Sequence, residues 1–83
     1  MTIDALKQRG RPMIDWDSVA WNLKDHMASE GLSIRDLQKK IGVDKATISR
    51  ICNGKRCTPE AYLAVCIEMG AKPAYFFIED DDF

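Results

Sequence analysis

Residues 33–58 read SIRDLQKKIGVDKATISRICNGKRCT, a stretch that predicts two short helices joined by a glycine-containing turn. Ser33 is a suitable N-cap for the first helix, because its hydroxyl can accept a hydrogen bond from an unpaired amide of the first turn. Asp36, three residues later, can complete a capping box. Gly42 stands where a chain that leaves a helix commonly turns left-handed. The core positions of this helix, at helical spacing, are Ile34, Leu37 and Ile41.

The second predicted helix starts two residues after Gly42 and ends at Asn53-Gly54. Asp44 is its expected N-cap. The side chains expected in the core are Ile48, Ile51 and part of Cys52. The other faces carry cationic, hydroxyl and small side chains, namely Lys45, Ala46, Thr47, Ser49 and Arg50. Two helices joined in this way, the second with such side chains, form the arrangement that places a recognition helix in the DNA major groove.

This stretch resembles the lambda-repressor-like, or Xre-type, helix-turn-helix family of phage Cro and repressor proteins, over roughly residues 19–77. The positions that match the apolar pattern and turn glycine of the family are Leu37, Ile41, Gly42, Val43, Ile48 and Ile51. The run Asn53-Gly54-Lys55 is similar to the end of many recognition helices of the family, and Pro59 to the proline that opens the next helix. The resemblance implies an all-α fold, a compact bundle of about five short helices that binds DNA.

The resemblance also implies a set of DNA contacts. The residues expected to contact bases are Lys45, Ala46, Thr47, Ser49 and Arg50, and those expected to contact phosphates are Ser33, Arg35, Lys55 and Arg56. Ile34 stands where many members have a phosphate-contacting glutamine, so Arg35 is expected to take over that contact. Arg50 is the best candidate for a guanine, because its planar guanidinium can donate two hydrogen bonds to O6 and N7.

The distribution of charge supports a nucleic-acid partner although the net charge of the chain is −1. Residues 33–58 contain seven basic and two acidic residues, a net charge of +5, whereas the remainder carries −6. Phosphate attraction is local at physiological salt, so the position of the basic cluster matters more than the total. Double-stranded DNA is therefore the expected partner.

The regions before the two central helices are predicted to be a basic arm and a further helix. That helix begins after Asp15 or Asp17, runs to Ser29 or Glu30, and is terminated by Gly31. Its apolar stripe consists of Trp16, Val19, Ala20, Leu23 and Met27. Two further side chains of this helix lie off the apolar stripe. Trp21 is expected in the core rather than on a partner surface, and His26 is expected on the surface. The arm can reach along a DNA groove, although a disordered terminus is an equal alternative.

A fourth helix is predicted from Thr58-Pro59, a cap followed by proline at the first helical position, to Gly70. The core residues expected from it are Tyr62, Leu63, Cys66, Ile67 and Met69. Residues 74–78, AYFFI, follow as a short helix or an extended segment. Because four consecutive large apolar residues cannot all face inward, a homodimer contact is predicted through Tyr75, Phe76 and Ile78.

The size of the chain, 83 residues with 46% hydrophobic content, suits one small domain. The expected organisation is an N-terminal basic arm (1–13), a helix-turn-helix domain (14–78) and an acidic tail (79–83). No apolar run reaches the length of a membrane span and no secretory signal is recognisable, so a cytoplasmic location is expected. A zinc site formed by the three cysteines and His26 is not expected: Cys52 and Cys66 are predicted to be reduced thiols that pack as small hydrophobic side chains, and Cys57 lies in a loop where it can be exposed. No cofactor is expected.

These features favour a sequence-specific transcriptional regulator, similar to a phage or prophage Cro or repressor protein, that binds an inverted-repeat operator as a homodimer. The alternative from another class is an antitoxin-type helix-turn-helix protein whose main role is to bind a partner protein. An enzyme is not expected, because the sequence offers one histidine, no nucleophile with an evident base and no phosphate-binding glycine loop.

Overall fold

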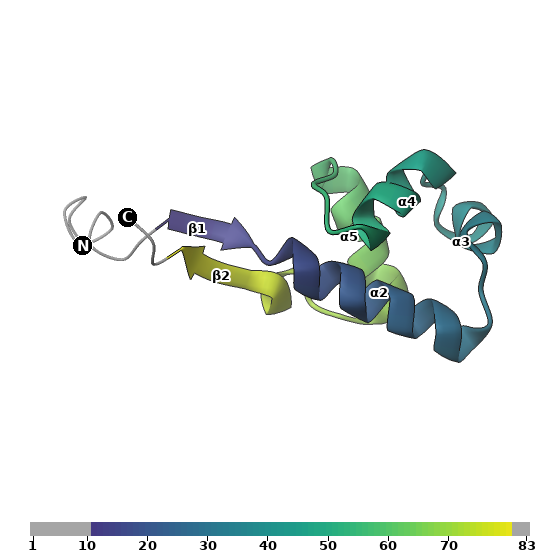
Figure 1. Cartoon of the computed structure of the whole chain (residues 1–83), viewed down its shortest axis with the longest axis horizontal. Coiled ribbons are helices and arrows are strands. Elements are labelled where there is room, and N and C mark those ends of the chain that lie inside the picture. Colours follow the sequence, from purple (N-terminus) through teal and green to yellow (C-terminus); the bar gives the residue numbers. More distant parts are fainter. Residues whose placement is uncertain (1–10, 81–83) are drawn as a thin grey trace.

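The computed structural model describes residues 11–80 and shows, in that range, four α-helices, one 3₁₀ helix and one two-stranded sheet (Figure 1). The helices are α2 (Trp16–Glu30), α3 (Ile34–Ile41), α4 (Lys45–Cys52), α5 (Pro59–Met69) and the 3₁₀ helix η1 (Pro73–Phe76). The strands are β1 (Arg11–Ile14) and β2 (Phe77–Asp80). The helical fold class is as predicted, but residues 11–80 contain four α-helices rather than five, and the sheet was not predicted.

The boundaries of α3 follow its capping residues. The Ser33 hydroxyl accepts a hydrogen bond from the Asp36 amide at 3.1 Å, and the Ser33 amide donates to the Asp36 carboxylate at 3.0 Å, so the predicted capping box is formed. At the other end, Gly42 has a φ of +74°, a conformation that glycine adopts without a Cβ clash. The direction in which the chain enters α4 is therefore set by a local feature of the sequence.

The caps of α5 and α4 differ in how closely they follow the prediction. The Thr58 hydroxyl accepts a hydrogen bond from the Ala61 amide at 3.2 Å, and Pro59 occupies the first turn of α5, both as predicted. Asp44 is the N-cap residue of α4, but its carboxylate accepts a hydrogen bond from the Thr47 hydroxyl at 2.6 Å and makes no cap bond to a backbone amide. Asp44 therefore fixes the side chain of Thr47.

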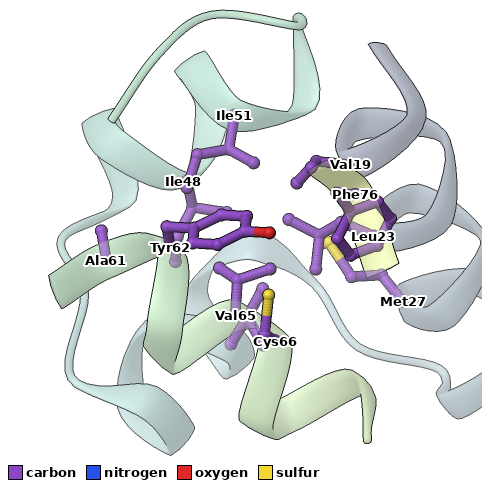
Figure 2. Close-up of a cluster of buried hydrophobic side chains, with 11 residues drawn as sticks. Val19, Leu23, Met27, Ile48, Ile51, Ala61, Tyr62, Val65, Cys66 and Phe76 are labelled. Atoms are coloured by element: carbon purple, nitrogen blue, oxygen red, sulfur yellow. The ribbon is translucent and has the colours of Figure 1, made fainter. Parts of the chain in front are cut away.

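The core lies where the four helices α2, α3, α4 and α5 meet η1, and Figure 2 shows most of its side chains. Its buried members are Val19, Leu23, Met27, Leu37, Ile48, Ile51, Ala61, Tyr62, Val65, Cys66 and Phe76. The Tyr62 hydroxyl donates to the carbonyl of Pro73, and the Tyr62 ring lies edge-on to Trp16 and Phe76, with centroid distances of 5.6 and 6.4 Å. One side chain of α5 thus holds the start of α2 and the C-terminal segment together.

Three predicted core positions are wrong. Leu63 is exposed and Ile67 is 79% exposed. These two residues are four positions apart and therefore lie on one side of α5, which is in contact with solvent. The opposite side of α5 is buried in the core and carries Ala61, Tyr62, Val65 and Cys66. Trp21 is 67% exposed because the face of α2 that carries Val19, Ala20 and Leu23 is the one that packs. The indole of Trp21 therefore belongs to the surface.

The two strands pair antiparallel, with Ile14 opposite Phe77, Met13 opposite Ile78, Pro12 opposite Glu79 and Arg11 opposite Asp80. The ribbon projects from the helices at the end of the molecule where α2 begins (Figure 1). It contains the last residues of the predicted arm and the first residues of the predicted acidic tail. Residues 1–10 and 81–83, which make up the rest of the arm and tail, lie outside the described residues.

A small polar cluster joins α2, α3 and α5. Oε2 of Glu68 lies 2.9 Å from Nε2 of His26 and 3.0 Å from Nζ of Lys40. The hydrogen bond to His26, and then the bond to Lys40, hold the pKa of the Glu68 carboxyl below its ordinary value of 4.5. His26, expected to be an ordinary surface residue, therefore has a structural partner.

Glu68→Gln is expected to lower the free energy of unfolding at pH 7 by about 1 kcal/mol, because it removes one ion of a partly exposed cluster. Since the Glu68 pKa is lowered in the folded chain, the ionised carboxylate stabilises the fold above pH 4.5, and this contribution is lost as the pH falls through the lowered pKa. Urea unfolding across pH 2.5–7 should therefore show a difference that shrinks on acidification.

The matched control is Glu30→Gln, which removes the same charge from an exposed position at the end of α2. It is expected to change the free energy of unfolding little at any pH. A difference between Glu68→Gln and the unchanged chain that stays constant on acidification would mean that Glu68 acts through packing and not through charge.

Candidate nucleic-acid interface

The orientation of α4 follows from its two fully buried side chains, Ile48 and Ile51. They pack in the core between α2 and α5, and α4 also packs against α3 (Figure 2). Because a helix places residues three and four positions apart on one face, this packing fixes which residues of α4 face away from the core. Ala46 and Arg50, four residues apart, lie side by side on the exposed face.

The five residues predicted to contact bases are all on α4, but they differ in accessibility. Lys45, Ala46 and Arg50 are exposed, whereas Thr47 and Ser49 are half-buried. The Thr47 hydroxyl donates to Asp44, and this bond lowers the pKa of the Asp44 carboxyl, which therefore stays ionised at neutral pH. The exposed face of α4 thus presents the cationic side chains of Lys45 and Arg50 and the methyl group of Ala46, whereas the hydroxyls of Thr47 and Ser49 are less accessible.

The chain folds back under the C-terminal end of α4. The carbonyl of Arg50 accepts hydrogen bonds from the amides of Asn53, at 3.0 Å, and Lys55, at 2.9 Å, and Gly54 between them has a φ of +76°. Lys55 and Arg56 are both exposed in the loop that follows. A shallow hollow of about 250 Å³ is lined by Thr47, Arg50, Arg56, Cys57 and Thr58. Arg50 of the helix and Arg56 of the loop therefore border the same depression of the surface.

The N-terminus of α3 carries the other two residues predicted to contact phosphate, Ser33 and Arg35. Both are exposed, but the capping box already occupies the amide of Ser33. The hydrogen bond from the Ser33 amide, and then the interaction with the Ser33 hydroxyl, lower the pKa of the Asp36 carboxyl, so a carboxylate stands beside Ser33 at neutral pH. A phosphate at Ser33 would therefore have to compete with the carboxylate of Asp36.

The basic residues of residues 33–58 are all exposed: Arg35, Lys39, Lys40, Lys45, Arg50, Lys55 and Arg56. Lys40 is the member that pairs with Glu68, and it therefore serves the polar cluster between the helices. The others stand on α3, on α4 and on the loop after α4. Basic side chains thus accompany both helices of the helix-turn-helix.

The segment predicted for the dimer contact divides into buried and exposed side chains. Tyr75 and Ile78 are exposed, but Phe76 is only 2% exposed because it fills the core next to Tyr62. Phe76 thus belongs to the core of its own chain, and the contact between chains stays a prediction in which Tyr75 and Ile78 offer the exposed surface. Sequence reasoning missed Met13 and Phe77, which are exposed on the ribbon, because the pairing of residues so far apart has no local signal.

The three cysteines are reduced in the structure, with Cys66 buried and Cys52 and Cys57 half-buried. Burial raises the pKa of each thiol, which keeps all three protonated and weakly nucleophilic at neutral pH. Within residues 11–80, no three histidine, cysteine or acidic side chains lie close enough together to hold a metal ion. In the same range, none of the helices combines the length and apolar character that a membrane crossing requires.

Comparison with known protein families gives one finding. A family model described as helix-turn-helix matches residues 23–75, a range that begins within α2 and contains α3, α4 and α5. Comparisons with curated proteins and with solved structures gave no match. The family match covers more than half of the chain and leaves both strands of the ribbon outside it.

Ser33→Ala tests whether Ser33 acts as a helix cap or as a phosphate ligand. Loss of the cap is expected to lower the free energy of unfolding by about 1 kcal/mol in urea titrations. Ser29→Ala, at an exposed position in the last turn of α2, is the matched control and should cost little. A normal stability of Ser33→Ala combined with weaker binding to every DNA sequence would assign Ser33 to phosphate contact alone.

Proposed function

The chain belongs to the helix-turn-helix family of DNA-binding regulators, and from this premise we propose that it is a sequence-specific transcriptional regulator of the phage or prophage Cro and repressor type. It acts in the cytoplasm as a homodimer on an inverted repeat. The centres of the two half-sites lie about one helical turn, roughly 34 Å, apart. It regulates by occupying a promoter and excluding the polymerase.

The observation that carries this proposal is the orientation of α4. Ile48 and Ile51 are fully buried, so Ala46 and Arg50 face outward together, and Lys45 opens the helix on the exposed side. An α-helix with such a face fits the major groove of B-DNA, whose base pairs each present a distinct pattern of donors and acceptors. This arrangement supports α4 as the recognition helix.

The side chains of α4 have different tasks in the proposed complex. Arg50 donates two hydrogen bonds to O6 and N7 of one guanine, and Lys45 donates to a guanine or a phosphate. Ala46 contacts the methyl group of a thymine. Thr47 and Ser49, which are half-buried, reach a base edge or a phosphate only where the DNA approaches closely.

The phosphate contacts come from both sides of α4. Lys55 and Arg56 hold the backbone that passes the C-terminal end of α4, where Arg56 borders the same hollow as Arg50. Arg35, with the hydroxyl of Ser33, holds the backbone at the start of α3. These contacts fix the position of α4 in the groove without reading the sequence.

Arg50→Ala is expected to reduce the affinity for the preferred site by about 1–3 kcal/mol and to relax the preference at one base position. The measurement is selection of bound duplexes from a random DNA pool near physiological salt, carried out with the unchanged chain and with the variant. Enrichment of the same sequence by both proteins, or of no sequence by either, would contradict the proposed docking of α4.

Lys55→Ala is the matched control, because it removes one positive charge from the loop next to α4. It should weaken binding to all sequences alike and lower the dependence of affinity on salt by about one phosphate contact. A loss of sequence preference in Lys55→Ala, with none in Arg50→Ala, would reverse the two assignments.

A second candidate function, an antitoxin-type protein that binds a partner protein, is supported by the exposed indole of Trp21. It borders a hollow of about 700 Å³ between α2 and the end of α4, lined also by Asp17, Lys24 and Asp25. Exposed aromatic side chains are typical of the centre of protein interfaces. This surface is independent of the base-contacting face of α4.

Trp21→Ala separates the two candidates. If the chain works through DNA alone, the variant should bind its selected operator within about twofold of the unchanged chain and control a reporter promoter equally well in cells. Normal DNA binding in vitro with loss of promoter control in cells, at equal protein levels, would favour the partner-binding function.

A further inference from the structure

The ribbon of β1 and β2 is incomplete as a sheet. It has only two strands within the described residues, it projects beyond the helices (Figure 1), and it lies outside the family match. A two-stranded ribbon is marginally stable in water by itself, and each of its outer edges leaves backbone groups unpaired. The two edges of this ribbon differ in what they offer to a third strand.

The direction of the backbone groups follows from one hydrogen bond. The Asp15 amide donates to the Phe76 carbonyl at 2.8 Å, in the same register as the strand pairs, so residues 15 and 76 form a hydrogen-bonded pair. Hydrogen-bonded and non-hydrogen-bonded pairs alternate along an antiparallel ladder. The amides and carbonyls of Phe77 and Glu79 on β2, and the corresponding backbone groups of Pro12 and Ile14 on β1, therefore point outward.

Pro12 makes the outer edge of β1 defective. Proline has no amide proton, and because Pro12 is in an outward-facing position, its presence costs no bond within the ribbon but removes a donor from the edge. The outer edge of β2 has no such gap, since Phe77 and Glu79 each supply a donor and an acceptor. A further strand is therefore best accepted at β2.

We propose that this edge of β2 pairs antiparallel with β2 of a second copy of the chain, so that two ribbons form one four-stranded sheet. The two-fold axis passes between the two Ile78 residues, and Phe77 of each copy exchanges two hydrogen bonds with Glu79 of the other. This contact specifies the homodimer of the proposed function and rests on it.

The side chains of the ribbon suit this arrangement. Met13 and Ile78 are directly opposite each other on one face, and they are 44% and 41% exposed. Joining two ribbons at β2 extends this pair into a row of four apolar side chains across the sheet, Met13 and Ile78 of one copy followed by Ile78 and Met13 of the other. Ile78 meets its counterpart in a non-hydrogen-bonded pair, the geometry that brings opposite side chains closest.

Charge favours the antiparallel register with a second copy. Glu79 lies across from Phe77 of the other chain, so the two Glu79 carboxylates lie on opposite sides of the axis. An in-register parallel pairing would place Glu79 beside Glu79, and like charges directly opposite are destabilising. The outer edge of β2 is thus complementary to the same edge of a second copy only in the antiparallel orientation.

The first test is disulfide trapping with Ile78→Cys. In the proposed sheet the two Cα atoms at position 78 are about 4.5 Å apart, within the range that a disulfide spans. The control is Met13→Cys, on the same face of the ribbon, whose two copies would be separated by three strand spacings, about 14 Å. Under mild oxidation, Ile78→Cys is expected to give a covalent dimer, while Met13→Cys and the unchanged chain remain monomers on a non-reducing gel.

The second test compares Glu79→Pro with Glu79→Ala. Proline at 79 removes an outward donor as Pro12 does on β1, and should leave the pairing of β1 with β2 intact; alanine removes the same charge and keeps the donor. Sedimentation is expected to show a monomer for Glu79→Pro and a dimer for Glu79→Ala. Circular dichroism and thermal unfolding show whether both variants are folded.

Equal cross-linking of Ile78→Cys and Met13→Cys, or none of either, overturns the proposal. So does a folded Glu79→Pro variant that dimerises like Glu79→Ala. Neither readout needs DNA, so the pairing is tested separately from the proposed function. If Ile78→Cys gives a covalent dimer but the DNA selection enriches no sequence, the contact between ribbons would be supported and the proposed function as a sequence-specific regulator would be contradicted.

Discussion

The burial of Ile48 and Ile51 is the constraint on which the functional surface depends. These two side chains fix the rotation of α4 about its own axis, and this rotation alone determines that Ala46 and Arg50 are exposed while Thr47 and Ser49 are set back. Because α4 has only eight residues, it has little helical stability of its own and relies on tertiary packing. The capping box of α3 and the left-handed Gly42 then limit the angle at which the chain enters α4. Core packing and turn chemistry therefore combine to present the basic face.

The C-terminal segment is held by a different set of contacts, centred on Tyr62. Its hydroxyl bonds to the carbonyl of Pro73, and its ring packs edge-on against Trp16 and Phe76. Burial raises the pKa of the Tyr62 hydroxyl, so the group is protonated and able to donate a hydrogen bond at neutral pH. Trp16 opens α2 immediately after β1, and Phe76 immediately precedes β2. The aromatic cluster therefore sets where the two strands leave the helices, and brings them close enough to pair.

What could be predicted from the sequence is what depends on neighbouring residues. The ends of the helices were predicted correctly because the residues that determine them act within one turn of the chain. These residues are Ser33 with Asp36, Thr58 with Pro59, and the glycines at 31, 42 and 70. The face of α5 was misjudged because Leu63 and Ile67 are as apolar as the residues that pack, and only the positions of α2 and α4 decide which side of α5 is covered. The ribbon was not predicted because its pairing also depends on the tertiary fold. Met13 and Ile78 are distant in sequence, and the aromatic cluster brings them together. The basic character of residues 33–58 can be read from the sequence. That Arg50 and Arg56 line the same hollow could not be predicted, because it depends on how the loop after α4 folds.

The placement of acidic groups bears on how the interface would recognise DNA. Asp36 and Asp44 stand at the starts of α3 and α4, and hydrogen bonds from Ser33 and Thr47 lower their pKa values, so both are ionised at neutral pH. A carboxylate at a helix N-terminus satisfies the partial positive charge there and competes with a phosphate for the same position. Affinity for the backbone must then come mainly from long basic side chains such as Arg35, Lys55 and Arg56, which extend beyond the helix ends. Such contacts weaken steeply with salt, so discrimination between sequences at physiological salt would depend on the contacts of α4 with bases and on the simultaneous binding of two copies. The ribbon lies outside the helix-turn-helix match, but Arg56 borders one hollow together with Ile14 and Phe77, so a contact between copies at the ribbon would lie next to a basic residue expected to hold the DNA backbone.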